Sequence, residues 1–293
     1  MSEFLPKFSA ATDQFKAFSK PGDFLSGSKE FLDSNTIIAK FSFLLLVLLV
    51  FVILLRLGTT LLSTLLSPDP EPYLFKGMID AKKMRVIPQN PSNNKSIPIL
   101  RSVNERDGIE FTWAVWIYID DFTYQEGQYK HIFHKGNDAP DMNQQGKNFP
   151  NNATGLYIAP NKNDLVVVMN TFDTIGEEIV VEDIPINKWM SVIVRCDGIN
   201  LDVFINGTLA RRHILSSVPK QNYDNVYVAM NNGFSGYMSN LRYFNSSLST
   251  SRIQNIVSQG PNKKMLGEDT VMSEPKYLST RWFFMGTKAD YQS

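Results

Sequence analysis

One uninterrupted apolar run constrains this chain more than any other feature. Residues 41–55 read FSFLLLVLLVFVILL, fifteen positions without a charge. A helix needs about 20 apolar residues to cross a bilayer, and residues 36–57 reach that length with Lys40 and Arg56 near the ends, where long side chains can reach the headgroups. A signal peptide would begin nearer the N-terminus and end at a small-residue cleavage site. We therefore predict an uncleaved single-pass transmembrane helix over residues 36–57, with Lys40 and Arg56 as anchor ends and the lipid bilayer as a partner.

The segment of residues 1–35 has a helical pattern of its own. Its apolar residues recur at steps of three and four, as on one face of a helix: Phe4, Phe8, Ala11, Phe15 and Phe18. Pro21 and Gly22 then break the pattern. A Phe-rich amphipathic helix beside a span can lie in the membrane interface or dock on a partner. The alternative is that it packs on the globular part of the same chain.

Proline dominates the segment after the span. Pro68, Pro70 and Pro72 stand at alternate positions, and Pro88 and Pro91 follow. Proline cannot continue a helix and favours an extended, semi-rigid spacer. We therefore predict a Pro-rich stalk or linker over residues 58–96, with room for one short strand near residues 74–79.

From residue 97 onward the chain has the composition of β-structure. Runs dense in β-branched and aromatic residues are typical of strands, and they stand at residues 111–119, 165–169, 178–181, 190–196, 201–205, 208–214, 226–230 and 237–244. Asp197-Gly198 and Asn206-Gly207 separate three of these runs, and such dipeptides are the strongest short hairpin signals. Residues 190–214 are thus predicted to form a three-stranded antiparallel meander.

One helix is predicted near the end of this domain. Residues 248–257 combine an N-cap at Ser249 with apolar residues at helical spacing, and Gly260-Pro261 ends the pattern. Many short strands with regular turns indicate a two-sheet sandwich or jelly roll. The predicted fold class is mainly β: an antiparallel two-sheet jelly-roll sandwich over residues 97–260, preceded by the transmembrane and amphipathic helices and followed by a tail over residues 261–293.

Composition excludes several functions. The chain has 293 residues, 29 basic and 29 acidic side chains, and one cysteine. A zero net charge argues against a nucleic-acid partner, because general nucleic-acid binders carry a basic face. One thiol excludes an internal disulfide framework or a Cys-rich zinc site, and Cys196 is interpreted as packed rather than reactive. His131 and His134 are three positions apart, so on a regular strand they would point to opposite faces and could not hold one ion together.

The order of the motifs resembles the laminin-G-like branch of the concanavalin A-like lectin/glucanase superfamily. The matching pieces are Phe111-Thr112 with Trp116, residues 131–136 (HIFHKG), residues 155–158 (GLYI), Asn187-Lys188-Trp189 with Val192, residues 203–207 (VFING), residues 234–243, and Leu248-Ser249 with Ile253. Each piece is weak alone, but seven pieces in the family's order are specific to its fold. The resemblance covers residues 97–260 and implies a sandwich that hosts lectins, hydrolases and interaction modules.

The resemblance raises the question of catalysis. Retaining glucanases of the superfamily use two carboxylates of an E-x-D-x-x-E strand, which lie about 5–5.5 Å apart. Glu105, Asp107 and Glu110 have this spacing here, but Asp107-Gly108 is a turn signal and the motif precedes the FT…W strand, where the family has a loop. We interpret the match as accidental and predict that the protein is not an enzyme.

The loop of residues 136–152 is the best candidate for a ligand site. Asp138, Asp141 and Asn143 offer the hard oxygen ligands that Ca²⁺ takes, and many lectin-like sandwiches bind calcium or sugar through such loops. The other interpretation is a solvated loop in which Asn and Asp form turns. We prefer the solvated loop, so no cofactor is predicted. If the loop does bind an ion, calcium is the candidate.

Two further features depend on context. Four N-x-S/T sequons, at Asn94, Asn152, Asn206 and Asn245, would matter only in a glycosylating lumen. The tail carries WFFM at residues 282–285, which is either a last strand or an exposed patch for a partner.

The predicted function is recognition or scaffolding at a membrane. An anchored sandwich with a Phe-rich N-terminal segment, many asparagines and no secretory disulfides resembles virion membrane proteins of large DNA viruses. That resemblance implies a structural minor capsid protein that ties an internal virion membrane to capsid proteins. The alternatives are a membrane lectin that binds glycan through the loop of residues 136–152, and a glucanase.

Overall fold

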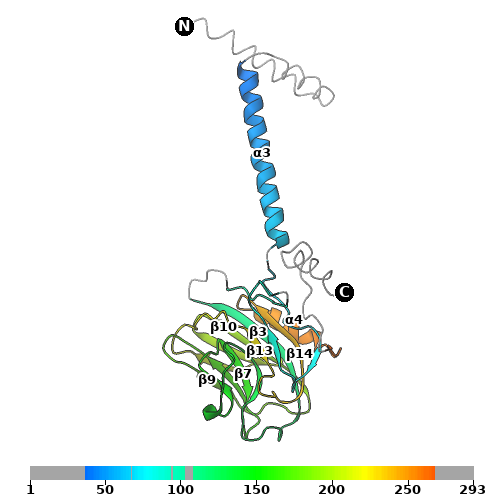
Figure 1. The fold of residues 1–293 in the computed structure, drawn as a ribbon, viewed down its shortest axis with the longest axis vertical. Coiled ribbons are helices and arrows are strands. Elements are labelled where there is room, and N and C mark those ends of the chain that lie inside the picture. Colours follow the sequence, from blue (N-terminus) through cyan, green and yellow to red (C-terminus); the bar gives the residue numbers. More distant parts are fainter. Residues whose placement is uncertain (1–36, 67, 94, 103–107, 268–293) are drawn as a thin grey trace, which may run out of the picture. The chain divides into compact units, whose positions relative to one another are not determined.

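The structure is a computed structural model that describes residues 37–66, 68–93, 95–102 and 108–267 (Figure 1). The chain divides into two units, residues 1–65 and 66–293, and each is described by itself. The predicted Phe-rich helix of residues 1–35 and the WFFM segment of residues 282–285 lie outside the described residues.

The apolar run forms the long helix α3 (Ile37–Leu66). Its segment from Lys40 to Leu65 is long and apolar enough to cross a membrane, and none of it is buried. The helix continues nine residues past the predicted end at residue 57. Thr59 and Thr60 each donate a hydroxyl hydrogen bond to the Arg56 carbonyl, at 2.9 and 2.8 Å, so these polar side chains are satisfied inside the helix. Thirty residues rise about 45 Å, more than a hydrocarbon core of about 30 Å requires.

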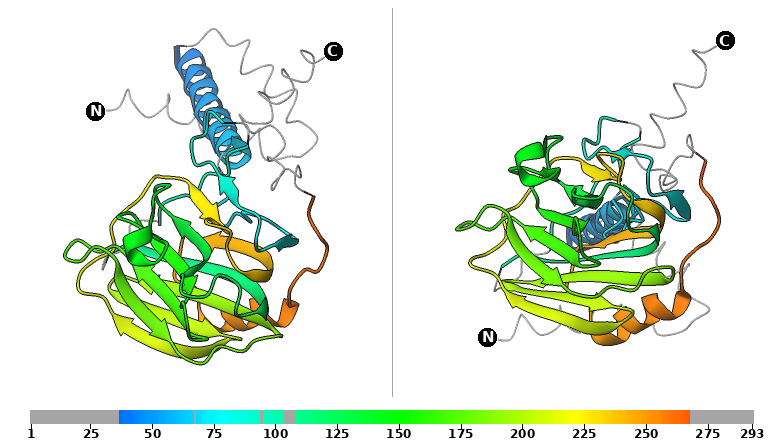
Figure 2. Two further views of the ribbon diagram at one scale, coloured as in Figure 1. Left: turned by 60° about the horizontal axis from the view of Figure 1, so that its bottom comes forward. Right: turned by 90° about the horizontal axis from the view of Figure 1, so that it is seen from below.

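Two antiparallel sheets form the sandwich (Figures 1 and 2). Sheet A contains, in spatial order, β1 (Met78–Asp80), β14 (Ser235–Phe244), β3 (Glu110–Asp121), β10 (Trp189–Asp197), β11 (Asn200–Ile205) and β12 (Thr208–Ile214). Sheet B contains β2 (Arg85–Ile87), β13 (Val226–Val228), β4 (Lys130–Lys135), β7 (Thr154–Ile158), β8 (Leu165–Met169) and β9 (Glu177–Val181). The predicted fold class, a mainly β two-sheet sandwich preceded by an apolar helix, is confirmed.

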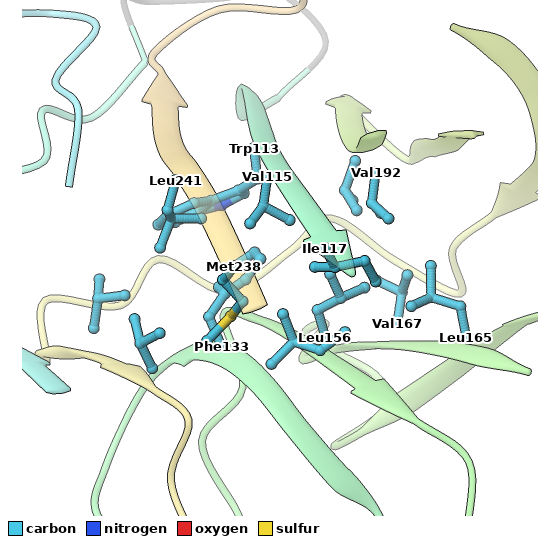
Figure 3. Close-up of a cluster of buried hydrophobic side chains, with 14 of the residues drawn as sticks. Trp113, Val115, Ile117, Phe133, Leu156, Leu165, Val167, Val192, Met238 and Leu241 are labelled. Carbon is cyan, nitrogen blue, oxygen red and sulfur yellow. The ribbon is translucent and has the colours of Figure 1, made fainter. Parts of the chain in front are cut away.

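The core lies between the two sheets, because alternate residues of each strand point inward. Trp113, Val115 and Ile117 of β3 are buried and meet Phe133 and Leu156 of sheet B (Figure 3). The rings of Trp113 and Phe133 lie 4.9 Å apart between centroids. One continuous apolar cluster therefore holds the sheets together.

The predicted meander is confirmed as β10, β11 and β12, which pair in sequence order. Asn206 and Gly207 have φ of +51° and +81° in the β11–β12 turn. A two-residue hairpin turn with positive φ at both positions matches the twist of its strands, and Asn-Gly is the pair that adopts it most readily.

The predicted helix is confirmed as α4 (Thr250–Gln259), with Ser249 at its N-cap and Gly260 at its C-cap. Ile253 is buried against Ala114, Ile193 and other residues on the outer face of sheet A. Figure 2 shows α4, in orange, on the outside of the sandwich.

The predicted stalk over residues 58–96 is wrong for most of its length. Its first nine residues belong to α3, and β1 and β2 pair with β14 and β13 as edge strands of the two sheets. Leu74 and Phe75 are completely buried, and the Leu74 amide donates to the Leu241 carbonyl at 2.8 Å. The prolines suggested an extended linker, but the short apolar stretches between them are buried, and that burial stabilises them in the sandwich. The sandwich therefore begins well before the predicted boundary at residue 97.

Candidate functional site

Two histidines that regular strand geometry would separate lie together on the outer face of sheet B. A register shift between His131 and Phe133 in the β4–β7 pairing inserts an extra residue. Such a β-bulge returns the following residues to the other face. The prediction that His131 and His134 point to opposite faces is therefore wrong: His131 Nε2 and His134 Nδ1 are 2.7 Å apart, and both rings are buried.

The hydrogen bonds determine which nitrogens of the pair carry protons. The Met230 amide donates to His131 Nδ1 at 3.0 Å, so that nitrogen is an acceptor. His131 Nε2 then donates to His134 Nδ1, and His134 Nε2 donates to the Asn137 carbonyl at 2.9 Å. All four ring nitrogens are occupied, which leaves no lone pair for a metal ion.

Both imidazoles are held neutral. Burial, together with the neighbouring ring of His134, lowers the pKa of His131 well below its usual 6.5. Burial also lowers the pKa of His134 to about 4. His134 stacks on the ring of Tyr227, with centroids 5.1 Å apart and planes 10° apart. The pair is thus a packed unit that is uncharged near neutral pH.

The histidine chain ends at Asn137, which begins a buried network of amides under the loop of residues 136–152. Asn148 Nδ2 donates to Asn137 Oδ1 at 3.0 Å and to the Asn151 carbonyl at 2.8 Å. Asn148 Oδ1 accepts from the Ala139 amide at 3.0 Å. One asparagine side chain therefore ties three separated points of the loop.

Asn152 and Tyr157 connect this loop to sheet B. The Tyr157 hydroxyl donates to Asn152 Oδ1 at 2.8 Å, and Asn152 Nδ2 donates to the Asn148 carbonyl at 2.7 Å. All three side chains are buried, and burial raises the pKa of Tyr157. A fully satisfied buried network fixes one conformation, so the loop is held rigidly.

The predicted ligand residues lie on the solvent side of this loop. It folds into β5 (Pro140–Asp141), the single 3-10 turn η2 (Met142–Gln144) and β6 (Lys147–Asn148). The Asp141 carboxylate accepts from the Asn143 amide at 2.9 Å, as a turn-former does, and Asp138 is exposed. Within the described ranges no three His, Cys, Asp or Glu side chains could share a metal ion. Calcium binding by Asp138, Asp141 and Asn143 stays a prediction.

The same loop presents apolar side chains to solvent. Met142 is 65% exposed and Phe149 is 39% exposed. Lys147 pairs with Glu178 of β9 and lies 4.6 Å from the ring centroid of Tyr129, so the loop is fastened to the sheet on this side as well. The loop therefore offers a rigid, partly apolar surface.

A second candidate site is an open groove of about 720 Å³ between the β7–β8 turn and the segment after β9. Its lining combines aromatic, aliphatic, amide and charged side chains: Phe122, Asn161, Lys162, Asn163, Asp164, Glu182, Asp183 and Ile186. Asp164 is buried and accepts from the Asp183 amide at 3.1 Å, which shapes the floor of the groove. No sequence motif pointed to this groove, because its residues come from separate turns.

Comparison with known families identifies the superfamily to which the sandwich belongs. A profile of the concanavalin A-like lectin/glucanases superfamily, of laminin-G type, matches residues 93–254, which is more than half of the chain. The protein belongs to this superfamily. A comparison with curated proteins found no match.

Solved structures similar to this superfamily member share little sequence with it. The receptor binding domain of botulinum neurotoxin C/D mosaic serotype has 11% identity over 62% of this chain and 42% of its own, with a TM-score of 0.45. The ligand binding domain of botulinum neurotoxin serotype D, in complex with N-acetylneuraminic acid, has 12% identity over 62% and 41%, with a TM-score of 0.44. The binding domain of Paraclostridial Mosquitocidal Protein 1 has 11% identity and a TM-score of 0.44. The chain spans less than half the length of these proteins, and the superfamily assignment rests on the sequence match.

The glucanase-like E-x-D-x-x-E spacing of residues 105–110 lies only partly within the described residues. Glu110 opens β3 opposite Asp197, and its carboxylate accepts from the Ser247 amide at 3.2 Å, so it fastens the turn before α4. Glu105 and Asp107 lie outside the described residues. Glu110, the member of the motif that lies among the described residues, therefore has a structural contact.

The remaining sequence candidates lie in different environments. Cys196 is fully buried, and burial raises the pKa of its thiol to about 12, which confirms it as packed. Asn152 is buried, with both side-chain polar atoms in the amide network, whereas Asn206 is exposed and accepts from the Ser191 amide at 2.9 Å through Oδ1. Lys40 and Arg56 are exposed on α3.

Proposed function

We propose that this protein is a non-catalytic, membrane-anchored recognition protein that ties a lipid bilayer to a protein shell, as in a virion minor capsid protein. Helix α3 supplies the anchor, and the loop of residues 136–152 supplies the contact with the shell. Three observations support this: the span-length apolar helix, the rigid loop, and the structural engagement of Glu110.

The rigid loop is the observation that carries the proposal. Binding orders loops and side chains at a cost, and a loop already fixed in one conformation avoids most of that cost. Here buried asparagines support the loop from below while Met142 and Phe149 project outward. Apolar side chains on a rigid polar frame suit a protein surface, because large apolar contacts supply binding energy there.

Site-specific photo-crosslinking tests this. A photo-crosslinking amino acid at position 142 should capture a protein partner in native membranes or virions. The matched control is position 214, because Ile214 on β12 is also 65% exposed. We expect cross-links from position 142 and none from position 214, unaffected by free glycans. A photo-crosslinking amino acid at position 149 should capture the same partner, and about tenfold less of it when Met142→Ser is added. Equal capture at positions 142 and 214, or none at position 142, would contradict the proposal.

A second candidate function is glycan binding, favoured by the groove. Sugars are typically held by an aromatic face beside amide and carboxylate groups, and Phe122, Asn161 and Glu182 bring these together. A glycan array probed with the full chain in detergent, with and without Ca²⁺, tests it. Binding that falls at least tenfold in both Phe122→Ala and Asn161→Ala would favour the lectin over the tether, and an array without signal would exclude it.

A further inference from the structure

One side edge of the sandwich brings together two basic segments that are far apart in sequence. The Met78 amide donates to the Lys264 carbonyl at 2.7 Å, and the Leu266 amide donates back to the Met78 carbonyl at 2.8 Å. Arg85 Nη2 donates to the Gly267 carbonyl at 3.3 Å. Residues 76–87 and 261–267 therefore run side by side, and together we call them the basic edge.

The basic edge concentrates positive charge on an otherwise acidic domain. It holds six basic residues and one acidic residue: Lys76, Lys82, Lys83, Arg85, Lys263 and Lys264, with Asp80. Residues 97–260 carry thirteen basic and seventeen acidic residues. β1 and β2 begin the strand order of their sheets, whereas β9 ends that of sheet B, and residues 173–183 around β9 contain five acidic residues and no basic one. The basic edge is thus a local excess of positive charge on a sandwich whose average charge is acidic.

The side chains that carry this charge indicate the kind of partner that the basic edge would bind. Lys76, Lys82, Lys263 and Lys264 are exposed, and lysine is a mobile point charge rather than the rigid fork with which arginine selects single carboxylates. Exposed apolar side chains stand among them: Met84, Val86 and Met265 are 44%, 42% and 51% exposed. Diffuse positive charge mixed with apolar side chains suits an anionic bilayer surface better than one acidic peptide.

We propose that the basic edge binds the anionic headgroups of a lipid bilayer. The lysines meet the headgroup phosphates and carboxylates, while Met84, Val86 and Met265 enter the interface. The inference rests on the proposed membrane anchoring, and it adds the chemistry of the lipid. Each lysine near an anionic surface strengthens such binding about fivefold, so a few lysines suffice for a domain already anchored to the membrane.

Amine footprinting of the full chain tests this with an internal reference. The protein is placed in nanodiscs of phosphatidylcholine, alone or with about one third phosphatidylserine, and lysine acetylation rates are measured by mass spectrometry. Phosphatidylserine should slow acetylation of Lys76, Lys82, Lys263 and Lys264 about tenfold at low salt and much less at high salt. Lys162 and Lys188, which are exposed elsewhere on the sandwich, should react equally in both discs. Equal rates for all six lysines would overturn the proposal.

Charge-matched variants sharpen the test. Lys263→Glu/Lys264→Glu should abolish the protection of Lys76 and Lys82, whereas Lys162→Glu/Lys188→Glu, with the same change in net charge, should leave it intact. Equal loss in both variants, or protection by soluble polyglutamate instead of phosphatidylserine, would also overturn it. Co-elution with nanodiscs tests the anchor separately: a chain that co-elutes without protection contradicts only the basic edge, and a chain that does not co-elute contradicts the proposed function.

Discussion

The outer faces of the two sheets are covered in chemically different ways. On sheet A, helix α4 buries an apolar cluster that includes Phe204, Phe244 and Ile253. On sheet B, the loop of residues 136–152 covers the two histidines and Tyr157 through a chain of hydrogen bonds. We call these the apolar cover and the polar cover, and sheet B has in addition a small outer apolar cluster of Tyr157, Val166 and Val168.

The two covers have different physical consequences. An apolar cover stabilises in proportion to the area removed from water and does not depend on direction. A polar cover adds little net stability, but each buried group left without its partner costs free energy, so only one arrangement is tolerated. The cover of sheet A thus stabilises the domain, whereas the cover of sheet B specifies the shape of the proposed recognition loop.

Truncating the apolar cover should give the largest effect. Phe244 is completely buried under α4, and Phe244→Ala should lower the free energy of unfolding by about 3–5 kcal/mol. Urea unfolding of the full chain in detergent, followed by tryptophan fluorescence, measures this. Leu209→Ala on the exposed strand β12 is the control and should cost less than about 1 kcal/mol. Similar costs at both positions would show that α4 does not form the cover described here.

Between pH 6.5 and 4, acid should weaken the domain through the histidines of the polar cover. The unfolded chain protonates its histidines near pH 6.5, whereas folded His134 has a pKa of about 4 and burial holds the pKa of His131 well below 6.5. Between these values the unfolded state binds more protons, so stability is complete above about pH 6.5 and falls as the pH drops towards 4. His134 alone accounts for about 3 kcal/mol of that loss.

Two variants separate this effect from general acid sensitivity. Across pH 4–6.5, Phe244→Ala should give a urea-midpoint curve parallel to that of the unsubstituted protein, only lower. His134→Gln should give a flatter curve, because one titrating group is gone. If His134→Gln kept the full slope, the histidine pair would not be the acid-sensitive part of the domain.

Sequence reasoning succeeded where structure is decided locally. The Asn206-Gly207 turn, the strands of the meander and the helix after Ser249 each follow from short-range chemistry, and all are confirmed. The seven ordered motifs then identified the sandwich. These features need only a few neighbouring residues to form, so a single sequence contains their signal.

Sequence reasoning failed where pairing partners decide. The bulge between His131 and Phe133 exists because β4 must match β7, and nothing in the local sequence marks it. Likewise β2 was not predicted, and the short strand predicted near residues 74–79 only overlaps β1, because these strands are short and pair with the edge strands β13 and β14. The loop of residues 136–152 stays a predicted ligand site. Its supporting amides could not be predicted, because Asn137, Asn148 and Asn152 resemble ordinary turn residues.

Removing one hydroxyl should loosen the polar cover by a smaller amount. Tyr157→Phe keeps the ring but removes the donor to Asn152 Oδ1, and leaving that buried acceptor unpaired should cost about 1–3 kcal/mol. Hydrogen exchange should accelerate within residues 137–152 and stay unchanged in α4. Acceleration spread evenly over both covers would contradict a local network.

The smallest effect is expected at the N-terminus of α4, within the apolar cover. Replacing an N-cap serine by alanine normally costs about 0.5–2 kcal/mol, because its hydroxyl accepts a helix amide. Ser249 has the extended N-cap backbone but no side-chain capping bond, and its hydroxyl contacts that of Ser251 at 3.1 Å instead. Ser249→Ala should therefore change the urea midpoint by less than the equivalent of about 0.5 kcal/mol. A full capping loss would mean that the serine hydroxyl, and not apolar burial alone, holds α4 on sheet A.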